Sequence, residues 1–269
     1  MTIRSDGNVK TRQIPGLTRR SVSTHGACRN INGDVFLCGN SGYIRKVKSD
    51  GTVAWDTNFK SDKGEDGTLD VGFSEKQNEL IAFGFSFEPD TKFTTKESNL
   101  WLAKLDSDGK FTARTEFEGI VNLGKNPAFC LSKSGNPVVI YDNSQTAWQI
   151  YVTKFSNNLT KAWTIPIFDA NSMMIDVSVT PLDDEFTLAI LSTMARQGQL
   201  RFYIIDSNGS IINQAVFDMG TVNYLVAVSK DKIFFVKDEH EMKNNKIHFY
   251  AKLICFKINN CTEGKPPQN

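Results

Sequence analysis

Several features that would point to a particular chemistry are missing from this sequence of 269 residues. No apolar run approaches the length of a membrane-spanning helix, and no helical hydrophobic period persists. The net charge is +1, and its 31 basic and 30 acidic residues are mixed, so there is no basic stripe for nucleic acid. His25, His240 and His248 have no metal-ligand spacing. We therefore expect no membrane span, no nucleic-acid partner, no metal and no other cofactor.

Cysteine is sparse, with five residues, and an odd number leaves at least one thiol free or paired with another chain. Cys28 and Cys130 each precede a glycine by five residues, which indicates equivalent, buried positions in two copies of a repeat. A single disulfide is the alternative, with Cys28 and Cys38 flanking one hairpin. The N-terminus lacks the apolar segment of a signal peptide but begins inside a repeat. We therefore favour a periplasmic or secreted location, with the leader absent from this chain, over a cytoplasmic one.

A repeat of about fifty residues is what the sequence does contain. In the copy at 99–118, two extended runs flank Asp108-Gly109, a signal for a hairpin with a type I′ turn and positive φ at both residues. Equivalent turns are predicted at Asp50-Gly51, Asn208-Gly209, Asn157-Asn158 and Asn259-Asn260, since asparagine tolerates the left-handed conformation.

A second hairpin precedes each of these, and its second strand is nearly all apolar, as in 80–85 and 138–141. Such strands are expected to be buried on both faces, between stacked sheets. The sequence therefore predicts an all-β fold: one domain over 1–269, a five-bladed β-propeller of four-stranded antiparallel blades. We expect 8–14 to pair beside 247–258 and close the ring. The C-terminal residues could instead form the fourth strand of that last blade. Two candidates for one strand position leave a truncated six-bladed propeller as the alternative.

The segments GDVFLCGNS, NELIAFGFSF and NLWLAKLDSDGKF resemble a family of bacterial β-propeller repeats in which a glycine-ended strand precedes a lysine-containing hairpin. Lys46 and Lys154 keep the lysine, whereas Ile204 and Cys255 replace it. The resemblance implies a propeller, often exported, and implies no reaction. The residues that carry it are Gly39, Gly84, Lys104, Leu105, Asp108, Gly109, Trp55 and Trp163.

Asp70 and Asp176 are candidate channel residues, because both fall near the start of a predicted innermost strand. Five-bladed glycosidases use a pair of carboxylates from such strands, so a glycan-binding or glycoside-hydrolysing propeller is the alternative function. Here no glutamate supplies the acid, and the two aspartates come from non-neighbouring blades. Polar groups that bind channel water explain them equally well.

Long predicted loops at 60–67, 87–97 and 238–246 carry the main functional prediction. We expect them to share one face and to engage a protein partner, so that the chain is a non-enzymatic binding module. A specific version is an inhibitor or immunity-type protein of a secreted hydrolase. The oligomeric state is left open, with a monomer favoured. The predicted partner-binding residues are Asp62, Glu65, Phe87, Glu88, Asp90, Lys92, Phe93, Asp238, His240 and Met242.

Overall fold

The structure, a computed structural model, describes residues 2–3, 9–10, 24–39, 41–60, 65–87, 98–119, 127–142, 149–168, 173–182, 185–194, 197–220, 224–228, 232–243 and 246–257. All regular structure in these ranges is β, so the all-β prediction is confirmed. The same ranges contain no helix that is long and apolar enough to cross a membrane.

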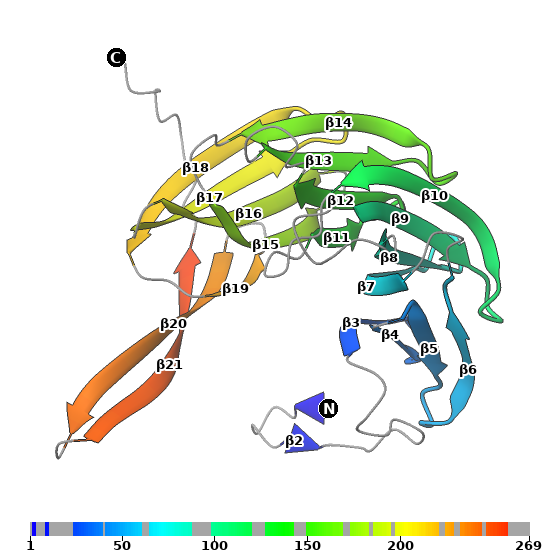
Figure 1. Cartoon of the computed structure of the whole chain (residues 1–269), viewed down its shortest axis with the longest axis horizontal. Coiled ribbons are helices and arrows are strands. Elements are labelled where there is room, and N and C mark those ends of the chain that lie inside the picture. Colours follow the sequence, from blue (N-terminus) through cyan, green and yellow to red (C-terminus); the bar gives the residue numbers. More distant parts are fainter. Residues whose placement is uncertain are drawn as a thin grey trace.

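Five antiparallel sheets follow one another along the chain, and Figure 1 shows them arranged around an arc. The first sheet contains β3 (Thr24–Arg29), β4 (Val35–Gly39), β5 (Tyr43–Val47) and β6 (Val53–Asn58). The second contains β7 (Glu65–Ser74), β8 (Glu79–Phe87), β9 (Ser98–Leu105) and β10 (Phe111–Gly119). The third contains β11 (Ala128–Leu131), β12 (Pro137–Asp142), β13 (Gln149–Phe155) and β14 (Lys161–Phe168).

The fourth sheet contains β15 (Met173–Leu182), β16 (Glu185–Met194), β17 (Gln197–Ile205) and β18 (Ile211–Gly220). The fifth has three described strands, β19 (Tyr224–Val228), β20 (Lys232–Lys243) and β21 (Lys246–Lys257). The first strands of consecutive sheets contact one another, β3 with β7, β7 with β11, β11 with β15 and β15 with β19. These strands therefore form the inner wall of the arc.

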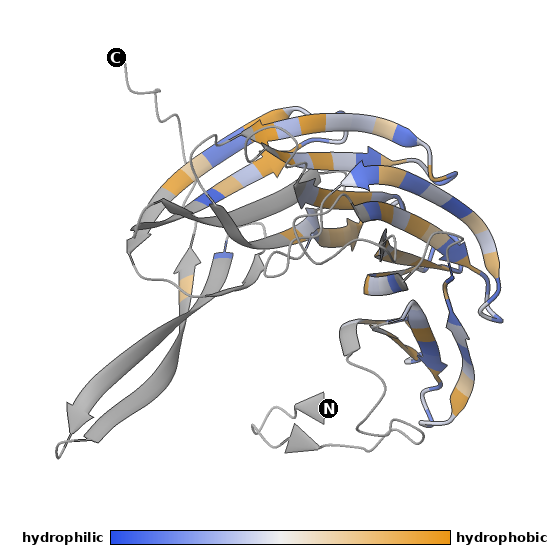
Figure 2. Ribbon diagram, viewed as in Figure 1, coloured by the Kyte–Doolittle hydropathy of each residue, from blue (hydrophilic) through white to orange (hydrophobic). Residues whose placement is uncertain are grey.

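Among the described side chains, the core lies between consecutive sheets, because middle strands such as β8 are apolar on both of their faces. In β8, Leu80 and Ala82 pack toward the first sheet, whereas Ile81 and Phe83 pack toward the third. All four are at most 1% exposed, so the prediction that 80–85 is buried on both faces is confirmed for these residues. Figure 2 shows the outer strands instead alternating between hydrophobic and hydrophilic bands.

The predicted hairpin turns that fall within the described residues lie where the sequence predicts them, but their type differs from the prediction. The turn predicted at Asn259-Asn260 lies outside the described residues. Gly109 has a φ of 79°, whereas Asp108 has no positive φ. The Asp106 carboxylate accepts hydrogen bonds from the N–H groups of Asp108 (3.0 Å) and Lys110 (2.9 Å), which holds a type I turn followed by a glycine bulge. The type I′ prediction is therefore wrong. In the turn at Asn157-Asn158, the left-handed residue is Leu159, with a φ of 58°.

The N-terminal strand pairs differently from the prediction. Val9–Lys10 (β2) pairs with Thr2–Ile3 (β1) in a two-stranded ribbon. Within the described residues, β21 pairs with β20 alone, so the expected pairing of 8–14 beside 247–258 is not formed there. The C-terminal candidate for the same place lies outside the described residues.

Candidate functional site

Of the predicted partner-binding residues, Asp62, Glu88, Asp90, Lys92 and Phe93 lie outside the described residues. Glu65 and Phe87 are the first residue of β7 and the last residue of β8, and they pair with each other in register. The predicted loop over 60–67 is wrong from Glu65 onward, because β7 begins there. Asp66 is already buried and accepts a hydrogen bond from the Ser86 hydroxyl at 2.5 Å.

The predicted loop over 238–246 is also wrong, since Asp238, His240 and Met242 lie on β20. Strand β19 pairs with β20 only up to Val236, whereas β20 and β21 continue to pair as far as Lys243 and Lys246. The two strands therefore form a two-stranded ribbon, residues 237–252, that extends beyond its sheet (Figure 1). We call this segment the β20–β21 ribbon.

The register gives the β20–β21 ribbon two unlike faces. His240 pairs with Phe249 and Met242 pairs with Ile247, so these four positions belong to one face. The positions between them belong to the other face and are occupied by Lys237, Glu239, Glu241, Lys243, Lys246, His248, Tyr250 and Lys252. The first face also includes the pair Asp238 and Ala251, so its apolar positions are concentrated near the tip of the ribbon, at Met242, Ile247 and Phe249. The other face is mainly charged.

Asp70 and Asp176 each lie on an innermost strand directly after a β-bulge, but not at the same register. Asp70 faces Phe83 and, through it, Leu102, three residues before the turn-flanking Leu105. Asp176 lies two residue pairs farther out, because it faces Leu191 and, through it, Leu200, five residues before the matching Ile205. In β7, pairing passes from Thr68 to Asp70, and in β15 it passes from Met174 to Asp176. The same irregularity in β3 makes Gly26 the register equivalent of Asp70 in the first sheet. Strand β19 has a similar irregularity between Leu225 and Ala227, so a bulge recurs on four innermost strands within the described residues.

The Asp70 carboxyl group is half-buried between the first and second sheets. A Cβ atom at Gly26 would lie 2.4 Å from Asp70 Oδ1, so the glycine gives the carboxyl group its room. Oδ1 accepts a hydrogen bond from the N–H of Val71 at 2.8 Å. Burial raises the pKa of Asp70 to about 6 and outweighs that hydrogen bond, which acts in the opposite direction. The carboxyl group is thus half protonated near pH 6.

Three cysteines from three strands lie close enough to Asp70 to feel its charge. Burial, followed by the Asp70 carboxylate, raises the pKa of Cys28 and of Cys38 to about 12 and raises the pKa of Cys130 as well. Thiols of such high pKa are poor nucleophiles at neutral pH. Cys28 and Cys38 are free, so the disulfide alternative is wrong for this pair. The described residues hold no group of histidine, cysteine and acidic side chains suited to a metal ion.

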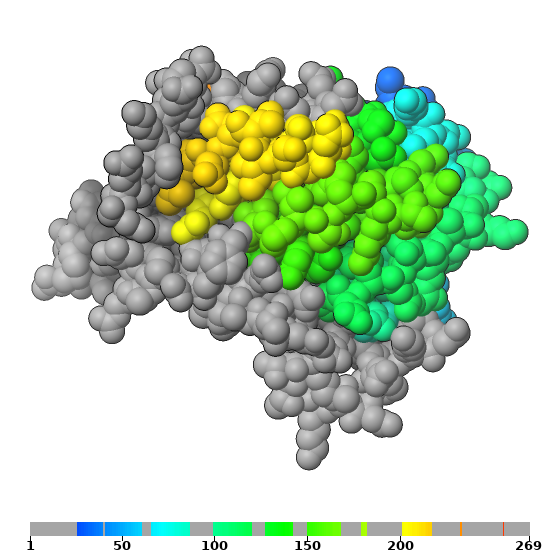
Figure 3. Space-filling model, turned by 90° about the horizontal axis from the view of Figure 1, so that it is seen from above, coloured from blue at the N-terminus to red at the C-terminus, as the bar shows by residue number. Residues whose placement is uncertain are grey.

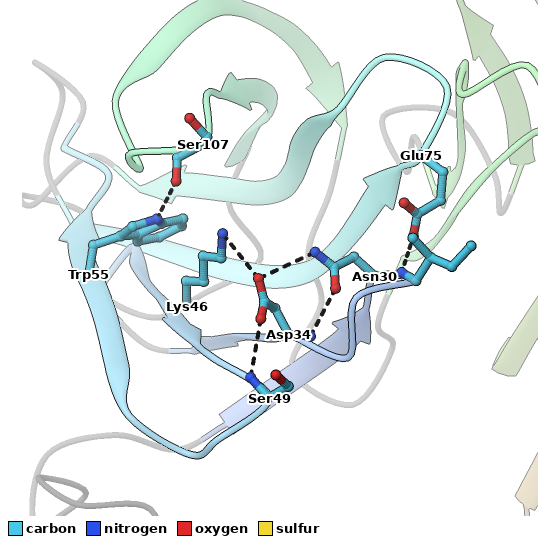
Figure 4. Close-up of polar contacts among 8 residues, drawn as sticks. Asn30, Asp34, Lys46, Ser49, Trp55, Glu75 and Ser107 are labelled. Carbon is cyan, nitrogen blue, oxygen red and sulfur yellow. Dashed lines mark hydrogen bonds and ion pairs between the residues drawn. The ribbon is translucent and has the colours of Figure 1, made fainter.

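A polar seam joins the outer parts of the first and second sheets (Figure 4). Asp34 accepts hydrogen bonds from the N–H of Ser49 (3.1 Å) and forms an ion pair with Lys46 (3.2 Å). Desolvation raises the pKa of Asp34, but the hydrogen bonds from Lys46 and Ser49 outweigh it, so that this pKa lies below 3.8. Across the seam, Trp55 Nε1 donates to the Ser107 carbonyl at 2.8 Å.

The repeated lysines of the sequence motif have structural roles that sequence reasoning missed. Lys104 Nζ lies 2.5 Å from both Glu79 and Asn157 Oδ1, and it thereby links the second sheet to the third. Lys154 Nζ donates to the Ser207 carbonyl of the fourth sheet at 3.2 Å. Their recurrence in the motif was the available signal, since a lysine kept at one register position of a sheet indicates a fixed partner.

The comparisons with known proteins bear on the fold alone. No protein-family model and no curated protein matches the chain. Among solved structures, it is similar to the Dos1 propeller, with a TM-score of 0.50 and 11% identity over 80% of this chain and 53% of that one. A GH43 β-1,3-galactosidase solved with galactodeoxynojirimycin gives a TM-score of 0.49 and 10% identity over 93% of this chain and 92% of that one. A thermostable family-43 glycoside hydrolase gives 0.46 and 9%, over 94% and 99%.

This chain therefore spans about half the length of the Dos1 structure that it matches. Together with the succession of antiparallel sheets along one inner wall, that likeness shows a β-propeller fold. At such low identity the likeness carries no activity with it.

Proposed function

We propose that this chain is a five-bladed, non-enzymatic β-propeller that binds a protein partner through the β20–β21 ribbon. The ribbon is the observation that carries the proposal. Its residues beyond Val236 on β20 pair only with the facing residues of β21 within the described part of the chain. A two-stranded ribbon in water is marginally stable, and burying one apolar face against another protein stabilises it.

The composition of the β20–β21 ribbon favours a protein surface as the partner. Met242, Ile247 and Phe249 supply apolar anchors of the size that dominates binding energy in interfaces. The charged residues of the opposite face keep the free ribbon soluble and surround the apolar anchors with polar groups. A projecting ribbon also fits a concave partner, which supports the specific version of the proposal, an inhibitor or immunity-type protein that enters the cleft of a secreted hydrolase in the periplasm or outside the cell.

The test compares the two faces of the ribbon. Ile247→Lys/Phe249→Lys places charge on the apolar face, whereas the matched control Lys246→Glu/His248→Lys changes charge on the other face. A photoreactive residue at Met242 identifies the cross-linked partner by mass spectrometry in the native organism. We expect a partner to be cross-linked at Met242 and its affinity to fall at least about a hundredfold in the first variant only. Equal affinity of both variants, or no specific cross-link, would overturn the proposal.

The alternative function, glycoside hydrolysis or glycan binding at the inner wall, draws support from Asp70. A general acid must hold its proton near the working pH, and the pKa of Asp70 is raised to about 6. Asp176, on the innermost strand two sheets away and two residue pairs farther from the hairpin turn, would be the second carboxylate. A panel of glycosides tested with wild type and with Asp70→Asn/Asp176→Asn decides this alternative. Turnover lost in the variant supports it, and no turnover or equal turnover removes it.

A further inference from the structure

The outermost strands of the first four sheets differ in how their open edges are protected. Within the described residues, each of these strands has a strand neighbour on one side only, so its other side has no strand partner in that part of the chain. Figure 3 shows the described part of β18, in yellow, on the surface beside β14, in yellow-green. Such edges pair with other chains unless charge, proline or bulges prevent it.

Three of the four edges carry such protection at matching positions. The exposed row of β6 includes Asp56, which forms an ion pair with Arg45 at 2.7 Å. The exposed row of β10 includes Arg114 and Glu116, which form an ion pair. The row of β14 ends in Pro166, which has no N–H to donate.

The edge of β18 carries neither charge nor proline over its described side chains. Its bulge at Ile212 does not distinguish it, because β6, β10 and β14 have a bulge at the same place after the turn. At the positions that match Ala162, Thr164 and Pro166 of β14, it carries Ile212, Gln214 and Val216. Ile212 is 51% exposed and Val216 is 55% exposed, and Ile211 beside them is 43% exposed. The segment 211–216 contains no charged residue. It is therefore an apolar and uncharged sheet edge.

The order of residues on this edge is self-complementary. If two copies of β18 pair antiparallel about a twofold axis at Gln214, Ile212 of each copy lies opposite Val216 of the other. Asn213 then lies opposite Ala215, and the two Gln214 side-chain amides lie opposite each other, where each has a donor and an acceptor. No like charges meet, and the exposed apolar residues of each copy cover one another. We propose that β18 is the dimerisation edge of this protein, occupied by β18 of a second copy.

The register makes this inference testable independently of the proposed protein partner. Ile212→Lys/Val216→Lys brings like charges together across the twofold axis, and we expect the dimer dissociation constant to rise at least about tenfold. Ile212→Lys/Val216→Glu places opposite charges at the same pair of positions and should restore most of the dimer. The control Ala162→Lys/Thr164→Lys makes the same change on β14 and should leave dimerisation unaltered. Sedimentation equilibrium gives the constants, and unchanged melting temperatures show that the variants fold.

A cross-link provides the second measurement. In a Cys255→Ser/Cys261→Ser background, Gln214→Cys should give a disulfide-linked dimer on mild oxidation, because position 214 faces itself across the axis. Thr164→Cys in the same background should not. A wild-type monomer at all concentrations would overturn the inference, as would a dimer that persists in the Lys/Lys variant or one that the Lys/Glu variant fails to restore. A monomer that instead adds an extended strand of another protein at β18 would also overturn it.

Discussion

The indole of Trp55 covers Gly109 of the next sheet, so closely that a Cβ atom on this glycine would lie 2.6 Å from the nearest indole carbon. Trp163 covers Gly209 in the same way, and a Cβ atom there would lie 3.0 Å from its indole. Between the second and third sheets the sizes are reversed. Ala113 takes the tryptophan position, and Leu159, 2% exposed, takes the glycine position and fills the core. Each of these three interfaces between sheets therefore contains one large side chain at this place. The earlier sheet provides it as Trp55 or Trp163, and the later sheet provides it as Leu159.

This size exchange predicts strong coupling between Ala113 and Leu159. Ala113→Trp alone should overfill the seam and reduce the free energy of unfolding by about 1–3 kcal/mol. Leu159→Gly alone should cost about 2–4 kcal/mol through lost burial, partly offset because glycine adopts a positive φ without strain. The double variant rebuilds the Trp55–Gly109 arrangement, so its loss should be smaller than the sum by at least about 1 kcal/mol. Urea unfolding measures all three, and additive losses would contradict the prediction.

Asp70 should make the protein less stable as the pH rises. Its pKa is raised from 3.8 to about 6 in the folded state, so the folded protein holds this proton more tightly than the unfolded chain does. That stabilising contribution is complete below pH 3.8 and is lost as the pH rises through 6. Asp70→Asn removes the titration, and at pH 7 it should raise the free energy of unfolding by up to roughly 3 kcal/mol. The gain over wild type should disappear near pH 4, and a gain independent of pH would contradict this account.

Asp34 should have the opposite pH dependence. Its folded pKa lies below 3.8, so its ion pair with Lys46 and its hydrogen bond from Ser49 stabilise the protein above that value. This stability is lost as the pH falls through the folded pKa. Asp34→Asn should therefore cost about 0.5–1.5 kcal/mol at pH 7 and much less in acid. Thermal unfolding across the pH range, with exposed Asp50→Asn as the control, tests whether the difference between wild type and variant closes in acid.

The described thiols should differ sharply in reactivity. Cys255 is exposed, whereas burial raises the pKa of Cys28 and of Cys38 to about 12. Reaction with an alkylating reagent at pH 8 should label Cys255 within the native protein and leave Cys28 and Cys38 unlabelled until urea is added. Peptide mass spectrometry reads the labelled sites. Labelling of Cys28 or Cys38 in the native state at a rate similar to that of Cys255 would show that these two thiols are accessible to the reagent and would contradict the prediction.

The sequence located the hairpins and the buried strands, because turn residues and apolar alternation act over a few neighbouring residues. It missed the turn type at Asp108-Gly109, since the Asp106 carboxylate decides which residues become left-handed. It also read 238–246 as a loop, because charged and apolar residues that alternate on a ribbon resemble a polar loop when the partner strand is unknown. The pairing of β2 with β1 was likewise out of reach, since strand pairing is a long-range choice.

By itself, then, the sequence determined that this protein is built of repeated antiparallel hairpins with doubly buried strands, because those properties follow from local backbone preferences and hydrophobic period. Only the tertiary structure decided which side chains meet across the seams, such as Trp55 with Gly109 and Asp70 with Gly26. It also decided that β18 presents an exposed apolar edge and that β20 and β21 extend as a ribbon. Contacts between residues far apart in the chain depend on how the sheets stack, and no local pattern encodes that geometry.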